Sequence, residues 1–340
     1  MASEVFFHIG LPKTGTTYLQ DVLWSGRESL LAEGVLLPGV GHRQHLWAAL
    51  DLQERRGLSQ RHPRAVGSFA ALTEQVRDWP GRAVISHEFF CGARREQVAT
   101  AMEALAPADV HLVITARDTL GMLTAGWTEY VKNGGSRSLE QMPPKGHRAP
   151  EFSWRTWDLG DVLRRWGTSV PPERVHVLTM PTREEPADQH WRNFAGVLGL
   201  TGQYEPSGHA ANPALGVAQI ETLRRVNDQL TGFAKPVDRG RWIRGYLAEE
   251  LLVRQHGDRP GASAEQVADC VTRAERAVAT IRERGYDVVG DLERLLVDPR
   301  QPGRREPGEV TDDEVIASAT ALVADMLTDV RELRRRPTGP

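Results

Sequence analysis

A lysine, a glycine and three threonines follow one another near the start of the chain, directly after a short apolar run. They are Lys13, Thr14, Gly15, Thr16 and Thr17. Free amides at the start of a helix bind anions, and a glycine lets the backbone approach a ligand closely. Threonine hydroxyls add hydrogen-bond donors, and a lysine adds a positive charge. Residues of these types at this spacing predict a site for a phosphate-like anion.

The order of these residues separates the loop from the common nucleotide phosphate loop. In the pattern G-x-x-x-x-G-K-[ST], the lysine follows the second glycine. Here Gly10 and Gly15 have the required spacing, but Lys13 precedes Gly15, and Thr16 stands where the pattern has its lysine. The loop is therefore predicted to be a phosphate loop of another type.

The stretch PKTGTTYLQ, residues 12–20, resembles the 5′-phosphosulfate loop of sulfotransferases that use 3′-phosphoadenosine 5′-phosphosulfate (PAPS). That family's loop reads approximately P-K-[ST]-G-[ST]-[ST]-x-L-Q and follows the N-terminal strand. The resemblance, which is to bacterial-type members, covers roughly residues 5–200. It implies that Lys13 stabilises charge on the leaving group, and that the amides of residues 14–17 bind the 5′-phosphate.

A histidine and a glutamate stand side by side after a second apolar run, residues 83–86. Ligands bind at the carboxyl ends of strands in open α/β sheets, and both side chains are natural general bases. In the family, cytosolic members use a histidine in a T-H-x-P turn, which selects His87. Many bacterial and heparan-type members use a glutamate, which selects Glu88, and we favour Glu88. The alternative for either residue is to cap the next helix or to pair with Arg94 or Arg95.

An arginine follows the longest apolar run, residues 110–116. A nucleotide hydrolase with a Walker B motif has an acidic residue there to hold Mg²⁺. Because Arg117 comes first instead, the sequence favours binding of a second phosphate over binding of a metal. The alternative for Arg117 is a surface ion pair with Asp118 or Glu129.

The segment that begins at Arg117 resembles the 3′-phosphate motif of the same family. In that motif an arginine and a serine eight residues later hold the 3′-phosphate. Arg117 matches the arginine, Ala125 occupies the serine position, and Thr124 beside it can supply the hydroxyl only from a shifted or rotated helix. A related bacterial pattern, W-x-E-x-x-K, fits Trp127, Glu129 and Lys132.

Four strands, near residues 5–9, 83–86, 110–116 and 174–180, alternate with predicted helices. This alternation predicts an α/β fold in which helices flank a parallel β-sheet, with a largely helical C-terminal half. The resemblance implies a P-loop NTPase-like sulfotransferase fold. The apolar periodicity predicts helices over residues 18–31, 69–79, 92–105, 154–166, 188–199, 215–230, 264–284 and 312–336, and one that ends near Gln255.

We predict a single sulfotransferase-like α/β domain over residues 1–298, followed by a linker and a C-terminal helix over residues 299–340. The Gly- and Pro-rich residues 133–153 are predicted to form a long loop that closes over the ligands. Polar residues in the segment 42–62 fit a solvated surface, which we favour, or, alternatively, the rim of an acceptor site. They are His42, His45, Arg55, Arg56, Arg61 and His62.

Composition limits the class of protein. The 340 residues carry a net charge of −3, which excludes a general basic surface for nucleic acid. Two cysteines make no disulfide framework, and no long apolar stretch could span a membrane, so we expect a cytoplasmic protein. The charged terminal helix fits a solvated face or, as the alternative, a homodimer contact.

These observations favour a sulfotransferase that moves a sulfuryl group from PAPS to a hydroxyl or amine of a small-molecule or carbohydrate acceptor and releases PAP. The scheme requires no metal. Two other classes stay open: a P-loop kinase or nucleotide hydrolase, and a catalytically silent nucleotide-binding module that has lost its 3′-phosphate site. Ala125 is the best support for the silent module.

Overall fold

The computed structural model of the chain describes residues 2–143, 150–207 and 214–335. A parallel six-stranded sheet with strand order β2-β3-β1-β4-β5-β7 forms its centre. The strands are β1 (Glu4–His8), β2 (Val35–Leu36), β3 (Arg82–Ser86), β4 (Asp109–Ala116), β5 (Val175–Thr179) and β7 (Asp287–Val289). The predicted α/β fold with a parallel sheet flanked by helices is confirmed, and the four predicted strands agree within one residue at each end. Neither edge strand, β2 or β7, is among these four predicted strands.

The chain divides into two compact units. The first comprises residues 1–122, 147–210 and 269–297, and the second residues 123–146, 211–268 and 298–340. Helices α7 (Thr119–Lys132) and α13 (Ala264–Arg284) each contain residues of both units. The six-stranded sheet belongs to the first unit. The domain boundary at residue 298 stays a prediction, because compactness of the units does not test it.

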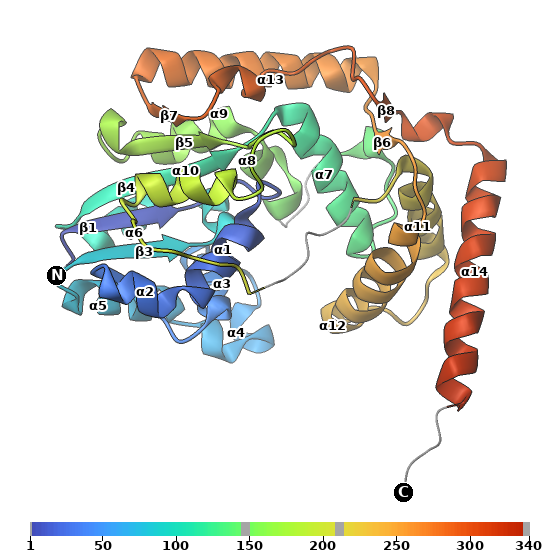
Figure 1. The fold of residues 1–340 in the computed structure, drawn as a ribbon, viewed down its shortest axis with the longest axis horizontal. Coiled ribbons are helices and arrows are strands. Elements are labelled where there is room, and N and C mark those ends of the chain that lie inside the picture. Colours follow the sequence, from blue (N-terminus) through green and yellow to red (C-terminus); the bar gives the residue numbers. More distant parts are fainter. Residues whose placement is uncertain (1, 144–149, 208–213, 336–340) are drawn as a thin grey trace, which may run out of the picture. The chain divides into compact units, whose positions relative to one another are not determined.

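Helices cover both faces of the sheet in the first unit (Figure 1). Phe6 belongs to a buried cluster with side chains of α1 (Thr16–Ser25), α2 (Arg27–Ala32) and α10 (Gln189–Val197). Phe7 points to the other face, where its ring centroid lies 4.7 Å from that of Phe90 and 5.3 Å from that of Trp166. The alternation of side chains along a strand thus anchors β1 in the core on both faces.

The predicted helix over residues 18–31 is wrong in one respect, since it is two helices that meet at Gly26. A Cβ atom at Gly26 would lie 2.4 Å from Cδ1 of Tyr204, so only glycine fits beside this ring. The Tyr204 hydroxyl in turn donates to Oε1 of Glu33 at 2.5 Å. A tertiary contact therefore ends α1 where the local sequence pattern continues.

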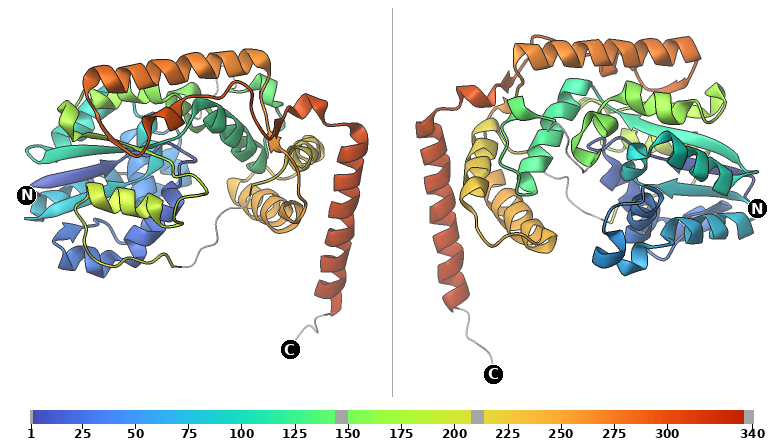
Figure 2. Two further views of the ribbon diagram at one scale, coloured as in Figure 1. Left: turned by 45° about the horizontal axis from the view of Figure 1, so that its top comes forward. Right: turned by 180° about the vertical axis from the view of Figure 1, so that it is seen from behind.

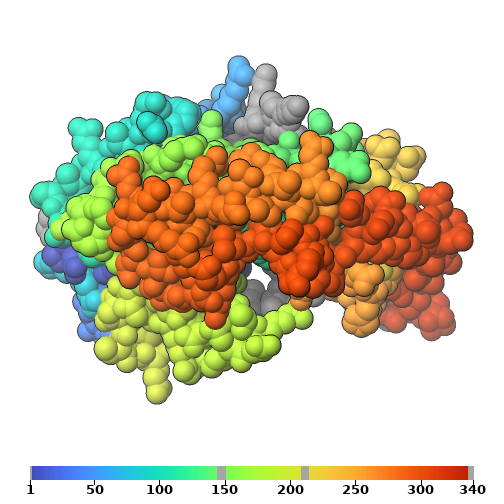
Figure 3. All heavy atoms as spheres, turned by 90° about the horizontal axis from the view of Figure 1, so that it is seen from above, coloured from blue at the N-terminus to red at the C-terminus, as the bar shows by residue number. Residues whose placement is uncertain are grey.

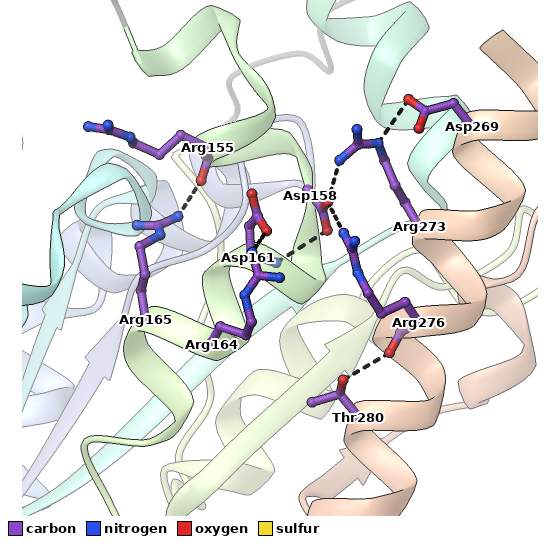
Figure 4. A network of polar contacts seen from close by, with 9 residues as sticks. All are labelled: Arg155, Asp158, Asp161, Arg164, Arg165, Asp269, Arg273, Arg276 and Thr280. Carbon is purple, nitrogen blue, oxygen red and sulfur yellow. Dashed lines mark hydrogen bonds and ion pairs between the residues drawn. The ribbon is translucent and has the colours of Figure 1, made fainter.

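The predicted helix over residues 154–166 is also divided, here at Asp158. It consists of α8 (Trp154–Trp157), α9 (Leu159–Val162) and the π-helical turn η5 (Leu163–Gly167). Asp158 is fully buried; it accepts from the Asp161 amide at 3.2 Å and pairs with Arg273 at 2.6 Å and Arg276 at 2.5 Å (Figure 4). The two arginines and the amide compensate for the buried negative charge of Asp158. The two ion pairs also join α13 to the start of α9.

The remaining predicted helices of the first unit are confirmed with small shifts at their ends. They are α5 (Ser68–Asp78), α6 (Arg95–Leu105) and α10. Two further helices, α3 (His42–Leu52) and α4 (Leu58–Arg61), come before α5 in the chain. The short 3-10 turn η2 (Glu88–Gly92) joins β3 to α6. The helix α13, coloured orange, forms part of the outer surface in Figure 3.

The second unit is mainly helical, as predicted for the C-terminal half. Its helices include α11 (Val217–Gln229), α12 (Pro236–Asp238), the π-helix η7 (Arg239–Leu251) and α14 (Asp312–Arg335). A two-stranded parallel pair, β6 (Arg259–Pro260) with β8 (Arg304–Arg305), links two of its segments.

Candidate functional site

The predicted phosphate loop joins β1 to α1, both in the first unit. The amides of Ile9 and Leu11 donate to the carbonyls of Val113 (3.0 Å) and Thr115 (2.8 Å). The first residues of the loop therefore run beside β4. The first helical hydrogen bond of α1 runs from the Leu19 amide to the Gly15 carbonyl at 3.2 Å. No side chain caps this helix start, and its first turn holds no acidic residue. The start of α1 thus has the electrostatics of an anion site.

Lys13 has a backbone φ of 64°. This left-handed conformation is uncommon for a residue with a side chain and costs roughly 1 kcal/mol or more. Strain of this kind persists where the surrounding structure enforces it, and it gathers at functional sites. The loop therefore holds the predicted catalytic lysine in a conformation that glycine would adopt without strain.

Two glycines make the loop tight. Gly10 and Gly15 have φ of 56° and 73°. A Cβ atom on Gly10 would lie 2.8 Å from Cγ2 of Thr16 and 2.9 Å from Cβ of Glu88, and one on Gly15 would lie 2.8 Å from the His190 ring. The conformation and the space at both positions require glycine. The same contacts place Glu88 against the phosphate loop.

The hydroxyl of Thr14 points into the protein. It donates to the Leu11 carbonyl at 2.6 Å and lies 2.6 Å from the hydroxyl of Thr115. His8 continues this buried network, with Nε2 3.3 Å from the Thr115 hydroxyl and Nδ1 2.7 Å from that of Ser86. Burial lowers the pKa of His8 to about 3, so the ring is neutral. Thr14 can therefore face a ligand only with its main chain.

The other loop residues differ in exposure. Thr16 is buried, Thr17 is exposed, and Lys13 and Gly15 are half-buried. Thr17 is thus the exposed threonine at the helix start.

His190, on α10, contacts the backbone of the phosphate loop, and the sequence analysis did not predict this contact. Its Nε2 lies 2.9 Å from the Thr14 carbonyl, which makes Nε2 the donor. Burial lowers the pKa of His190, so the neutral ring keeps Nδ1 as an acceptor. The contact joins residues 176 positions apart, and no local pattern indicates it.

Glu88 is the first residue of η2, and its side chain is 19% exposed. Its Oε2 accepts from Nε2 of Gln20, on α1, at 3.0 Å. Burial opposes ionisation, but nearby His87, the Glu88 amide and Gln20 outweigh it, and the pKa of Glu88 is lowered. Glu88 is thus an ionised carboxylate beside the phosphate loop, in the state that accepts a proton.

His87 caps the next helical turn, which the sequence analysis gave as the alternative role for His87 or Glu88. Its Nδ1 accepts from the Phe89 amide at 3.1 Å and so caps the start of η2. The side chain is buried, and burial lowers the pKa of His87. A ring whose Nδ1 holds a backbone amide is a poorer candidate base than Glu88. Neither residue pairs with Arg94, which binds Glu54 at 2.8 Å.

Arg117 lies directly after β4 and turns back over the start of α7. Its Nη1 donates to the Lys13 carbonyl at 3.4 Å, and its Nε lies 3.9 Å from Oδ2 of Asp118. A Cβ atom on Gly121 would lie 2.6 Å from the Arg117 guanidinium, so glycine makes room for it. Asp118 caps the helix by accepting from the Gly121 amide at 2.5 Å. Arg117 thus connects the two segments that were predicted to bind phosphate.

Thr124 belongs to the second unit, where its neighbour is a basic residue that sequence reasoning missed. Nη1 of Arg304 donates to the Thr124 hydroxyl at 3.2 Å and to the Pro260 carbonyl at 2.9 Å. Ala125, at the family's serine position, is half-buried. The basic residue beside Thr124 is thus Arg304.

The residues that fit the W-x-E-x-x-K pattern form a structural network within the second unit. Lys132 lies 3.4 Å from Oε1 of Glu249, Arg244 pairs with both Glu129 and Glu249, and the Trp127 indole donates to the Arg137 carbonyl at 3.0 Å. These contacts hold α7 to η7. Arg244 is therefore engaged in this network.

The polar segment 42–62 is largely a solvated surface, the interpretation that the sequence favoured. Four of its six residues are exposed: His42, Arg56, Arg61 and His62. His45 differs, since it is buried, accepts from the Ser86 amide at 3.1 Å and lies 2.8 Å from the Pro38 carbonyl. Burial lowers its pKa to about 4. His45 thus belongs to the core and to no acceptor rim.

A cavity of about 440 Å³ opens next to the η2 turn. All seven lining residues are charged: Arg94, Arg95, Glu96, Arg155, Asp161, Arg164 and Arg165. Five arginines and two carboxylates give the lining a surplus of positive charge, and all belong to the first unit. The cavity has the charge and size to hold an oxyanion on a small organic molecule.

Arg165 ties this cavity to the segment that begins at Glu88. It donates to the carbonyls of Cys91 (2.8 Å), Ala93 and Arg155, and Figure 4 shows it reaching Arg155. Its guanidinium has no carboxylate within ion-pairing distance in the described residues, although burial lowers its pKa. Arg165 thus remains a cation whose charge is not neutralised locally.

Part of the predicted lid, residues 144–149, lies outside the described residues, and its closure stays a prediction. Among the residues that the structure describes, no helix is long and apolar enough to cross a membrane. The same residues contain no group of three or more His, Cys, Asp or Glu side chains arranged for a metal ion.

Comparisons with known proteins give one structural similarity. No protein-family model matches the sequence, and no curated protein matches it. Among solved structures, the chain is similar to a sulfotransferase domain from the curacin biosynthetic pathway, with 11% sequence identity and a TM-score of 0.35. The similarity covers 84% of this chain and 98% of that domain.

Proposed function

We propose that the protein transfers a sulfuryl group from PAPS to a hydroxyl or amine of a small-molecule or carbohydrate acceptor and releases PAP. The contact of the phosphate loop with Glu88 carries this proposal. Gly10 packs against Glu88, and Gln20 of the same loop–helix segment binds its carboxylate. An anion site and an ionised base thus lie side by side, as transfer of a charged group to an acceptor requires.

The residues of the loop fit the 5′ end of the donor. The uncapped start of α1 offers amides and a positive dipole end, and Lys13 adds a charge. PAPS supplies an activated sulfuryl group on a phosphate leaving group. Lys13 stabilises the charge on that leaving group, and Arg117, which contacts the loop backbone, binds the 3′-phosphate.

Glu88 takes the proton of the acceptor as the new O–S or N–S bond forms and the S–O bond to the phosphate breaks. Its lowered pKa keeps it ionised at neutral pH, ready to accept. Gln20 fixes the direction of the carboxylate, and His87 holds the turn that presents it. Dimer formation and use of a metal do not enter this scheme.

Titration calorimetry tests the donor. We expect tight, Mg²⁺-independent binding of PAP and weak binding of ADP and ATP, followed by PAPS turnover in an acceptor screen. Mg²⁺-dependent preference for ATP would overturn the proposal in favour of a kinase or nucleotide hydrolase. PAP binding without turnover on any acceptor would favour the silent nucleotide-binding module.

The arginine-lined cavity favours acceptors that carry an anionic group. Exposed Arg95 and Arg155 line it and make no ion pair with the described residues. Replacement of both by glutamine should raise the KM of a sulfated or carboxylated sugar about tenfold or more and leave that of PAPS unchanged. Arg77→Gln, at an exposed position on α5, is the matched control. Equal KM values in the double variant and the control would rule out this role for the cavity.

A further inference from the structure

Helix α14 carries a stripe of exposed apolar side chains. Of the ten large hydrophobic residues that are exposed in the described part of the chain, five lie on this helix, with 45–64% of their surface exposed. They are Ile316, Val323, Leu327, Val330 and Leu333. A contiguous apolar stripe of this kind marks an interaction surface.

A different side of α14 packs within its own unit. Val315, Ser318 and Leu322 are buried on that side, and the helix contacts α11. The Ser318 hydroxyl donates to Oε1 of Gln255 at 2.6 Å, and the Tyr246 hydroxyl donates to Asp329 at 2.9 Å. In both views of Figure 2, α14 (red) is one uninterrupted helix. The second unit thus holds the helix by one side and leaves the stripe outside that contact.

Four of the five stripe residues fit a heptad repeat, and the fifth, Leu327, lies beside it at an e position. The a positions are Ile316, Val323 and Val330, and the d positions are Ala319, Met326 and Leu333. Apolar residues at the a and d positions of a heptad repeat form a seam that packs against a second helix. Three consecutive heptads therefore indicate a second helix as the occupant of this stripe.

The charges of α14 indicate how that second helix runs. Acidic residues gather at the helix start (Asp312, Asp313 and Glu314) and basic residues at its end (Arg331, Arg334 and Arg335). Asp313 and Arg334 occupy e positions, are exposed, and pair with no described residue. A helix of the same sequence complements these charges only when it runs antiparallel.

We propose that two copies of the chain associate through an antiparallel pairing of their α14 helices. In one register, Ile316 faces Leu333 of the other copy, Ala319 faces Val330 and Val323 faces Met326. The same register places Asp313 opposite Arg334 on both sides of the pair. One twofold axis thus satisfies the apolar layers and the flanking charges together, as a closed dimer requires.

Sedimentation velocity of the full chain tests the association. The wild type should shift from monomer to dimer over about 1–100 µM, as for an interface of small area. Val323→Glu/Val330→Glu should abolish the dimer, whereas Ala317→Glu/Ala324→Glu, on the outer side of the same helix, should not. Circular dichroism confirms that both variants fold. A wild type that is monomeric at all concentrations, or a dimer that persists in the valine variant, would overturn the proposal.

Charge exchange and cross-linking test the direction. Arg334→Asp should weaken the dimer about tenfold or more, and Asp313→Arg/Arg334→Asp should restore it. Under oxidation, Ile316→Cys mixed with Leu333→Cys should give the mixed disulfide-linked dimer, since both native cysteines are buried. Cross-linking of Leu333→Cys to itself would show a parallel pair and overturn the proposed arrangement. None of these readouts depends on sulfotransferase activity.

Discussion

Nε2 of Gln20 donates to Oε2 of Glu88 at 3.0 Å. Gln20 lies on α1, the helix whose start forms the phosphate loop, and Glu88 follows the neighbouring strand β3. The helix whose first amides are predicted to bind an anion thus also fixes the direction of the proposed base. A hydrogen bond to a carboxylate also favours its ionised form.

We predict that Glu88→Gln lowers kcat by about 10²–10⁴-fold, since it removes the proton acceptor. PAP affinity, measured by calorimetry, should not change. His87→Asn should keep turnover within a few-fold, because asparagine can accept the Phe89 amide in the same way. Full turnover by Glu88→Gln, or an equal loss in both variants, would refute the assignment of Glu88.

The pH–rate profile gives an independent check of the same base. The pKa of Glu88 lies below its ordinary value, so the carboxylate stays ionised on moderate acidification. We therefore expect kcat/KM to be flat between about pH 8 and 5.5. A limb that falls within this range would indicate a histidine instead; for His87, whose pKa is lowered by burial, its midpoint would lie below the ordinary value of about 6.5.

We predict that two substitutions of Lys13 lower activity alike but differ in their effect on thermal stability. Lys13→Ala and Lys13→Gly should both lower kcat by about 10²–10³-fold or more, because the charge that stabilises the leaving group is lost. At a φ of 64°, glycine avoids the strain that alanine keeps. Lys13→Gly should therefore melt at a higher temperature than Lys13→Ala in calorimetric scans. The reverse order of melting temperatures would contradict the strained loop.

We predict that Arg117 binds the 3′-phosphate of PAP. Arg117→Ala is expected to weaken PAP about tenfold or more while binding of adenosine 5′-phosphate, which lacks that group, changes little. Equal weakening of both nucleotides by Arg117→Ala would argue against its role.

Two buried histidines make stability depend on pH. The pKa is lowered to about 3 for His8 and about 4 for His45, below 6.5 for the unfolded chain. The unfolded state thus binds the extra protons, and stability present above pH 6.5 is lost as the pH falls toward 4. Each histidine should lower the free energy of unfolding by about 1.4 kcal/mol per pH unit well below pH 6.5.

Urea denaturation at pH 7, 6 and 5 measures this slope. The variant His45→Gln should remove the part of this slope that comes from protonation of His45. The control variant His62→Gln, at an exposed position, should leave the slope unchanged. A stability that is constant over this range would contradict the neutral, buried state of both histidines.

Much of the fold was predictable because its signals are local. The four strands are short runs of β-branched and aromatic residues, and they agree with β1, β3, β4 and β5 within a residue. β7 escaped prediction because Asp287–Val289 is too short to show a pattern. The predicted site residues fall into the loop, the end of β3 and the end of β4, and their roles stay predictions.

The sequence by itself determined where the phosphate loop and the candidate bases lie, since residue types at fixed spacing after a strand suffice for that. Tertiary structure alone decided which contacts these residues make. It turned the Thr14 hydroxyl inward, placed His190 beneath the loop and ended α1 against Tyr204. It also brought Arg304 to Thr124, across 180 residues. These outcomes depend on contacts between segments far apart in the chain, which leave no mark in a local pattern.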